Sequence, residues 1–156
     1  MDKAVWETAI GEEFQELLKG IVFGLPQPEP LFDPIQIPHT AFTKIFKTHR
    51  NIIDTKISPA VEKARITIKK DVWAKEQLYI LIEAPNKEKF MEIFTNKEMK
   101  ILDYLLEAEK DRLISNYRKY QDIGLKNHLI DLYNISITFP KGYQLDVDTT
   151  QFLWFS

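Results

Sequence analysis

The sequence predicts an α+β fold: a mainly antiparallel sheet with helices packed on one face, including one long helix near residues 87–121. Strand-like segments come in runs and do not alternate strictly with helices, which favours α+β over a parallel α/β sheet. The chain has 156 residues, of which 44% are apolar, so it can bury a substantial core. We therefore expect a single α+β domain over residues 1–156.

The first third of the chain predicts a helix, a rigid arm and a second, short helix. Asp2 is a suitable N-cap, apolar residues follow at helical spacing, and Gly20 is a suitable helix stop. Prolines at alternate positions in residues 24–34 favour a stiff extended arm in the polyproline II conformation. Thr40 is expected to cap a short helix that runs through Phe46.

Three strands are predicted next, over residues 51–57, 65–69 and 77–84. The second of them alternates polar and apolar residues, which is typical of a strand with one buried face. The third is apolar on both faces, so we expect it inside the sheet.

The second half of the chain predicts helices followed by strands. Asn86 is a suitable N-cap for the long helix, and Thr95 and Asn96 indicate a break within it, because both residue types prefer caps to helix interiors. Residues 125–133 predict a short helix. A hairpin is expected between residues 135–139 and 143–147, and a turn over Asp148-Thr149-Thr150 then leads into a last strand.

Composition excludes several kinds of chemistry. The absence of cysteine excludes thiol catalysis, cysteine-based zinc sites and disulfides. The three histidines (His39, His49 and His128) lack metal-ligand spacing, and Asp146 and Asp148 fit a turn better than a cation site. We therefore expect no metal and no cofactor. No nucleotide-binding glycine loop, Gly-x-Ser-x-Gly elbow or nucleic-acid signature is present, so we expect no nucleic-acid partner.

Charge is unevenly distributed along the chain. Residues 44–75 carry nine basic and three acidic residues, a local charge of +6 in a chain of net charge −2. Such a segment could attract a polyanion. The favoured interpretation is that its lysines are the solvated face of edge strands, where charge hinders aggregation.

Six polar or aromatic side chains are candidate binding residues: Gln27, Glu29, Asp33, His49, Arg50 and Trp73. Glu29 or Asp33 could pair with His49 or Arg50 as a charge-assisted cluster. Arg50 would then either form part of a site or, as we favour, anchor the rigid arm. Trp73 could stack on a sugar or a guanidinium, or simply cover a hydrophobic edge. We expect no catalytic residue, with a dispersed hydrolase site at Glu29, Asp33, His49 and Arg50 as the alternative.

Several sequence blocks resemble a known family. They are residues 24–33, 42–53, 70–75 and 139–143, with Val147-Asp148-Thr149-Thr150. They are similar to an uncharacterised domain-of-unknown-function family (4837-type) of Gram-negative, Bacteroidetes-like envelope lipoproteins. The resemblance implies a longer, two-part chain with a secretory signal, a lipid-modified cysteine and a second half. It also implies that Asp54 and Lys56 interrupt an apolar strand, which would then lie at a sheet edge.

The apolar run Phe152–Ser156 agrees with that implication, since native chain ends are usually polar, and we expect the chain to be a fragment of the longer lipoprotein. The expected function is a non-enzymatic binding or assembly module on the periplasmic side of the cell envelope. Its partner would be an envelope protein, a glycan or an anionic lipid surface. The membrane would be reached only through a lipid anchor that this chain lacks.

Overall fold

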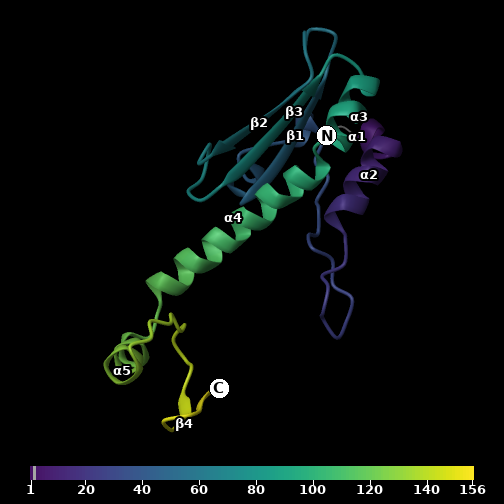
Figure 1. Ribbon diagram of the computed structural model, residues 1–156. Helices are drawn as coiled ribbons and strands as arrows, with labels where there is room; N and C mark the ends of the chain where they lie inside the picture. The colour runs from purple at the N-terminus through teal and green to yellow at the C-terminus, as the bar shows by residue number, and fades with distance from the viewer. Residues whose placement is uncertain (2) are drawn as a thin grey trace. The chain divides into compact units, whose positions relative to one another are not determined.

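The computed structural model describes Met1 and residues 3–156, so the predicted N-cap at Asp2 lies outside the described residues. The chain forms two compact units, Met1–Ala108 and Glu109–Ser156 (Figure 1). Both contain helices and strands, and the predicted α+β class is confirmed. The expectation of a single domain over residues 1–156 stays a prediction.

The first unit is built on a three-stranded sheet. Its strands are β1 (Asn51–Ile57), β2 (Arg65–Lys70) and β3 (Leu78–Ala84), in the order β1-β3-β2. The central place predicted for β3 and the edge place predicted for β1 are both confirmed. β2 pairs with β3 antiparallel and β1 pairs with β3 parallel. This sheet is therefore mixed. Two of the three strand pairings among the described residues are antiparallel, because the two strands of the second unit also pair antiparallel.

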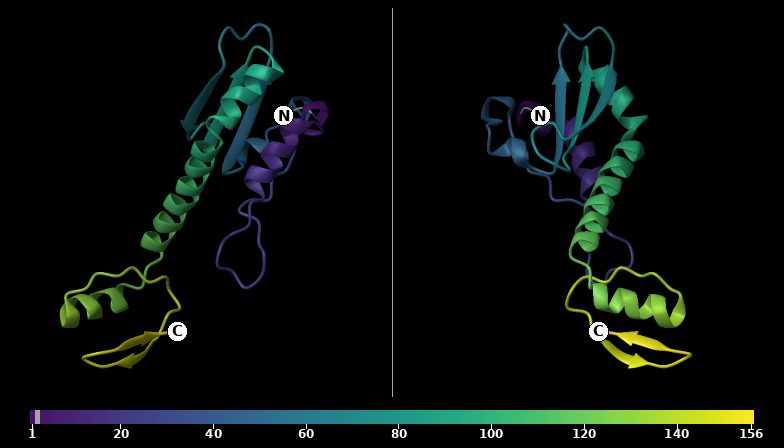
Figure 2. Two further views of the ribbon diagram at one scale, coloured as in Figure 1. Left: turned by 45° about the vertical axis from the view of Figure 1, so that its right-hand side comes forward. Right: turned by 90° about the vertical axis from the view of Figure 1, so that its left-hand side faces the viewer.

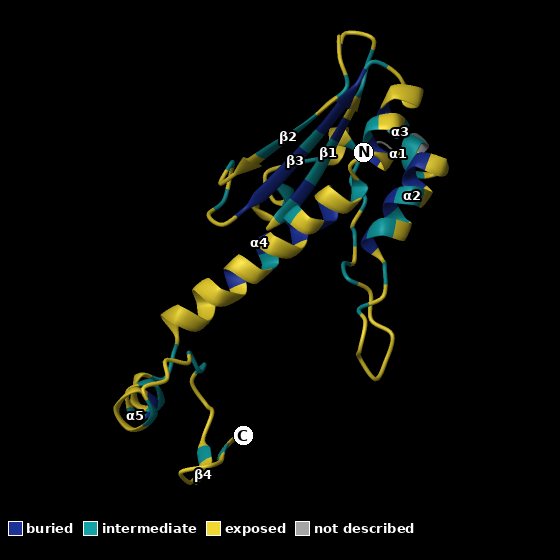
Figure 3. Ribbon diagram, viewed as in Figure 1, coloured by how far each residue is buried: buried dark blue, intermediate teal, exposed yellow. Residues whose placement is uncertain are grey.

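Helices pack on one face of this sheet, as predicted. They are α2 (Ala9–Leu18), α3 (Lys87–Thr95) and the first part of α4 (Glu98–Lys119), and Figure 3 shows buried residues gathered between them and β3. Phe14 of α2 stacks on Phe94 of α3 with ring centroids 4.1 Å apart. The buried side chains of this core are Ile10, Phe14, Leu18, Leu78, Ile80, Ile82, Ala84, Phe90, Phe94, Ile101, Leu105 and Ala108.

The first predicted helix is interrupted, so its continuity was predicted wrongly. A short helix, α1 (Lys3–Trp6), ends before α2 begins at Ala9. Gly11 explains how the two pack, because a Cβ there would lie 1.9 Å from the Trp6 carbonyl oxygen. Only glycine allows α1 to end against α2 in this way. The predicted stop at Gly20 is confirmed, since α2 ends at Leu18 with Lys19 as its C-cap.

The proline arm leaves α2 and folds back on it. Ile21 and Pro30 form an antiparallel bridge, and the Leu31 N–H donates to the Gly20 carbonyl at 2.7 Å. The arm is thus a loop closed at its base. The short helix predicted from Thr40 was wrong: two 3₁₀ turns, His39–Ala41 and Phe46–Thr48, take its place.

The long helical stretch has the predicted break. Asn86 caps α3 by accepting the Lys89 N–H at 2.9 Å, α3 ends at Thr95, and α4 begins at Glu98. Among the described residues, no helix combines the length and apolar character that a bilayer crossing needs.

The second unit contains the end of α4, the helix α5 (Ile123–Tyr133) and a hairpin of β4 (Leu145–Asp148) and β5 (Leu153–Phe155) (Figure 2). The hairpin predicted between residues 135–139 and 143–147 was wrong. Residues 139–141 instead bond to the end of α4: the Asp122 N–H donates to Phe139 O and the Lys141 N–H to Tyr120 O. The turn over residues 148–150 is confirmed, and it joins β4 to β5.

Candidate functional site

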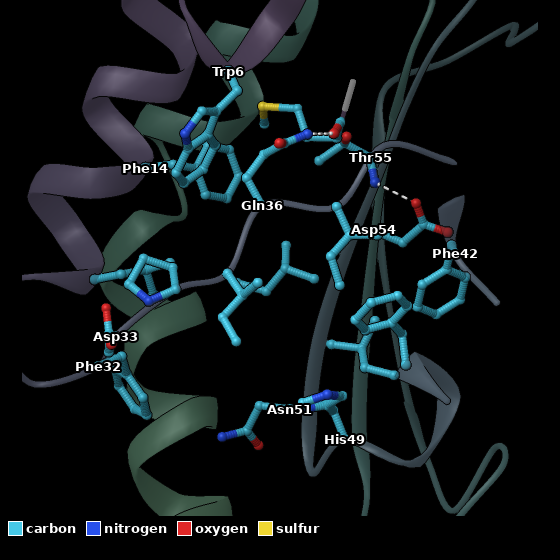
Figure 4. Close-up of a pocket in the computed structure, with 18 of the residues that line it drawn as sticks. Trp6, Phe14, Phe32, Asp33, Gln36, Phe42, His49, Asn51, Asp54 and Thr55 are labelled. Carbon is cyan, nitrogen blue, oxygen red and sulfur yellow. Dashed lines mark hydrogen bonds between the residues drawn. The ribbon is translucent and has the colours of Figure 1, made fainter. Parts of the chain in front are cut away.

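A cavity of about 620 Å³ lies within the first unit, between the helices and the free edge of β1. Figure 4 shows Trp6 and Phe14 on one side of it and Asn51, Asp54 and Thr55 of β1 on the other. Leu18 and Leu105 add further apolar surface to its lining. Its volume falls in the range of small-ligand sites, which are mostly apolar with a few polar groups.

The cavity faces the backbone edge of β1. Every residue from 51 to 55 lines it, although successive side chains of a strand point to opposite faces. Only the edge of a strand presents consecutive residues to one space. β3 lies on the other edge of β1, so the cavity occupies the side where no strand of the described residues is paired.

A second segment, residues 32–37, follows the proline arm and forms neither helix nor strand. All six of its residues line the cavity. Gln36 fixes it to the beginning of the chain, because its Nε2 donates to the Met1 carbonyl at 2.8 Å. At the base of the arm, the Phe32 N–H donates to Leu18 O at 2.9 Å. The backbones of β1 and of residues 32–37 therefore both border the cavity.

The structure brings three of the six candidate residues to this cavity. Asp33, His49 and Arg50 line it, all three are exposed, and Figure 4 shows Asp33 and His49 on opposite sides. Gln27 and Glu29 lie on the exposed part of the proline arm and do not line the cavity.

No hydrogen bond or ion pair among the described residues joins Glu29 or Asp33 to His49 or Arg50. The His49 ring instead stacks on Phe46, with centroids 6.1 Å apart. The arm is held by the backbone bonds at its base, so the structure gives no support to Arg50 as its anchor. A nucleophile hydrogen-bonded to a base, which is the arrangement of covalent hydrolysis, does not occur among these four side chains. The hydrolase interpretation gains nothing from this geometry and stays a hypothesis.

Trp73, the sixth candidate, belongs to an aromatic cluster. Its ring makes edge contacts with the rings of Phe42 and Tyr79, with centroid distances of 5.7 Å and 5.2 Å. Lys47 places its ammonium over the Trp73 ring, 5.3 Å from the centroid. Trp73 thus packs in an aromatic cluster, and its role as a binding residue or as the cover of a hydrophobic edge stays a prediction.

Gln77, which sequence reasoning missed, positions the loop that carries His49. Its side chain is 1% exposed, and its Nε2 donates to the carbonyls of Lys47 at 2.7 Å and of His49 at 2.6 Å. Its Oε1 accepts the Trp73 N–H at 3.1 Å. Gln77 thus holds one side of the cavity mouth. The only sequence signal was a glutamine at the start of a strand predicted to be fully buried.

Sequence reasoning also missed a His-Asp-Tyr cluster on the other face of the sheet. Asp54 contacts His39 Nε2 at 2.8 Å, accepts the Tyr79 hydroxyl at 2.8 Å and accepts the Thr55 N–H at 2.8 Å. Burial, followed by the hydrogen bond to Asp54, raises the pKa of Tyr79 well above its ordinary value. The phenol therefore stays protonated. The cluster ties the segment around His39 to β1 and β3.

A similar cluster lies in the second unit. Asp148 at the end of β4 contacts His128 Nε2 at 2.7 Å and accepts the Tyr133 hydroxyl. The hydrogen bond from Tyr133, and then that from His128, holds the pKa of Asp148 below its ordinary value. Both partners lie on α5, so the cluster fastens the hairpin to that helix. Asp148 is exposed, and its carboxylate bonds to side chains of the protein at the start of the turn.

The basic segment is partly neutralised by the sheet. Glu83 of β3, 5% exposed, pairs with Arg65 at 2.8 Å and Lys56 at 3.8 Å. Both cations lie on edge strands, as the favoured interpretation expects. Within the described part of the chain, no group of three or more His, Cys, Asp or Glu side chains is placed to hold a metal ion.

Comparison with known proteins gives a family and no activity. No curated protein and no solved structure matches this chain. The family model for a domain of unknown function, DUF8532, matches residues 1–118, which include the whole of the first unit. The expectation of a 4837-type family was therefore wrong. The match to the family model gives no evidence that the protein is a lipoprotein. The chain belongs to the DUF8532 family of domains of unknown function.

Proposed function

We propose that this protein is a non-enzymatic binding module and that the cavity beside β1 is its binding site. The single observation that carries the proposal is a cavity of about 620 Å³ whose lining combines apolar side chains with a few polar groups.

The cavity combines two chemistries that suit a ligand with apolar and polar parts. Trp6, Phe14 and Leu105 supply apolar surface, and His49 and Arg50 supply hydrogen-bond donors on the β1 side. The ligand would bury its apolar part against the helices and meet the donors with its polar part.

A thermal-shift screen with paired variants tests this proposal. The panel holds peptidoglycan fragments, lipopolysaccharide, anionic lipid headgroups, divalent metals and a pool of random peptides. A ligand at 100 times its dissociation constant stabilises by about 2.7 kcal/mol, roughly 5–10 °C in melting temperature for a chain of this size.

Ile35→Trp is the test variant and Ile45→Trp its matched control. The two isoleucines are 69% and 71% exposed, and only Ile35 lines the cavity. The bulkier side chain at position 35 should abolish the ligand-induced shift, while the control should retain it. A shift retained in Ile35→Trp, or no shift with any compound, would count against the proposal.

The location of the module is a separate proposal that rests on the resemblance alone. It places the protein on the periplasmic side of the envelope, lipid-anchored as part of a longer chain, with an envelope protein, glycan or anionic lipid as partner. Fractionation of cells that make the natural full-length protein tests it. Recovery in the cytoplasmic fraction would reject the envelope location and leave the cavity proposal unaffected.

A further inference from the structure

We propose that the occupant of this cavity is an extended polypeptide segment that adds a strand to the free edge of β1. This inference rests on the proposed binding function and names the class of ligand. Its basis is the hydrogen-bonding pattern of β1 together with the cavity that its residues 51–55 line.

The parallel register decides which backbone groups of β1 face the cavity. The Leu78 N–H donates to Arg50 O at 2.8 Å and the Ser58 N–H to Ala84 O at 3.0 Å, so even-numbered residues bond to β3. In a parallel pair, the residues between them turn their N–H and C=O groups to the other edge. Positions 51, 53, 55 and 57 therefore point their backbone groups away from β3.

Ile53 sits in the middle of the cavity wall with its backbone groups turned outward. Neither its N–H nor its C=O has a hydrogen-bond partner among the described residues. At the next outward position, the Thr55 N–H is satisfied by the Asp54 carboxylate. Donors and acceptors spaced along an extended backbone are complementary to another extended backbone, which is how a peptide adds to a sheet edge.

Residues 35–37 strengthen this assignment. The backbone N–H groups of Ile35, Gln36 and Ile37 likewise have no hydrogen-bond partner among the described residues, and these residues line the cavity consecutively. A strand in the cavity would thus have backbone donors of both segments beside it.

The side walls predict the character of the peptide. Successive side chains of a docked strand would point alternately to the two faces of the sheet. On the core face they would meet Trp6, Phe14 and Leu105. On the other face they would meet the segment that carries Phe42 and Phe46. We expect a peptide with apolar side chains at alternate positions toward the helices.

Selection from a displayed library of random seven-residue peptides, panned against the full chain, supplies the probes. Selected peptides that bind the natural sequence and fail to bind Ile35→Trp are synthesised. Their dissociation constants are then measured by fluorescence anisotropy against Ile53→Pro and Ile57→Pro.

The two proline variants are matched. Both replace an isoleucine that packs partly against the core, and both remove an N–H that points away from β3, so the ladder to β3 is kept. Only position 53 lines the cavity. We expect Ile53→Pro to weaken peptide binding at least tenfold and Ile57→Pro to change it less than twofold. Equal binding by both variants would overturn the inference.

If Ile53→Pro does not fold, hydrogen exchange of the unsubstituted protein tests whether the peptide adds a strand to β1. Saturating peptide should slow exchange of the Ile53 amide at least tenfold, because that N–H gains a backbone acceptor. Unchanged exchange would refute strand addition. The two proposals can fail separately. If a non-peptide compound gives a thermal shift that Ile35→Trp abolishes, and no peptide is selected whose binding Ile35→Trp abolishes, the binding function stands and the peptide inference is wrong. If neither a compound nor a peptide depends on Ile35, both proposals are wrong.

Discussion

Replacing Gln77 by leucine should loosen the loop beside the cavity and destabilise the first unit by about 3 kcal/mol. The side chain makes three hydrogen bonds, two as donor to Lys47 O and His49 O and one as acceptor from the Trp73 N–H. Each such bond contributes about 1 kcal/mol net. Leucine has a similar volume and satisfies none of the three, so the loss comes from hydrogen bonding and not from a cavity.

Urea unfolding followed by circular dichroism measures this loss. With a slope of about 2 kcal/mol/M, the unfolding midpoint should fall by roughly 1.5 M while the slope stays constant. Gln27→Leu is the control, because Gln27 is exposed and its side chain makes no hydrogen bond among the described residues. It should change stability by less than about 0.5 kcal/mol. A Gln77→Leu protein within 1 kcal/mol of the unsubstituted one would refute the role given to these bonds.

Three further predictions concern other parts of the chain. Gly11→Ala should destabilise by about 1–2 kcal/mol in the same urea assay, although alanine normally favours a helix, because its Cβ would meet the Trp6 carbonyl; a gain in stability would contradict this packing. Arg50→Ala should leave the melting temperature unchanged, because that side chain makes no ion pair among the described residues; a large loss would restore its role as an anchor. The pKa of Asp148 is lowered by Tyr133, so the carboxylate stabilises the folded hairpin above the ordinary Asp pKa of about 3.9, and this contribution is lost as pH falls through the lowered value. Once exchange rates are corrected for the intrinsic pH dependence of amide exchange, the protection of the hairpin amides should therefore fall below about pH 4, and Asp148→Asn should remove that fall; the same pH profile of protection in both proteins would reject the assignment.

Local signals predicted most elements of the first unit. The apolar run of β3 indicated a strand buried on both faces, and the caps and break of the long helical stretch followed from Asn86 and Thr95. The break after α1 was not predictable, because it depends on Trp6 meeting Gly11 in space. The hairpin error has a similar cause: residues 135–139 alternate like a strand, but Pro140 pairs with Gln121 at the end of α4.

The candidate site was only partly predictable for the same reason. Asp33, His49 and Arg50 were singled out from two separate polar segments, and all three line the cavity. The cavity itself depends on the place of β1 in the sheet, and its parallel pairing with β3 leaves no local trace in the sequence. A single polar residue in an apolar stretch is also ambiguous, so Gln77 was read only as the start of a strand.

The strand order has a consequence for how the chain can fold during synthesis. β1 and β2 leave the ribosome before β3, yet within the described residues each of them pairs with β3 alone. Until residue 84 has emerged, neither early strand has its sheet partner, and at 5–20 residues per second β1 waits for up to a few seconds. During that interval both edges of β1 are open, so nascent chains are most exposed to mispairing or chaperone capture before β3 appears. Slower translation between β1 and β3 should therefore lower the yield of folded protein more than slower translation after β3.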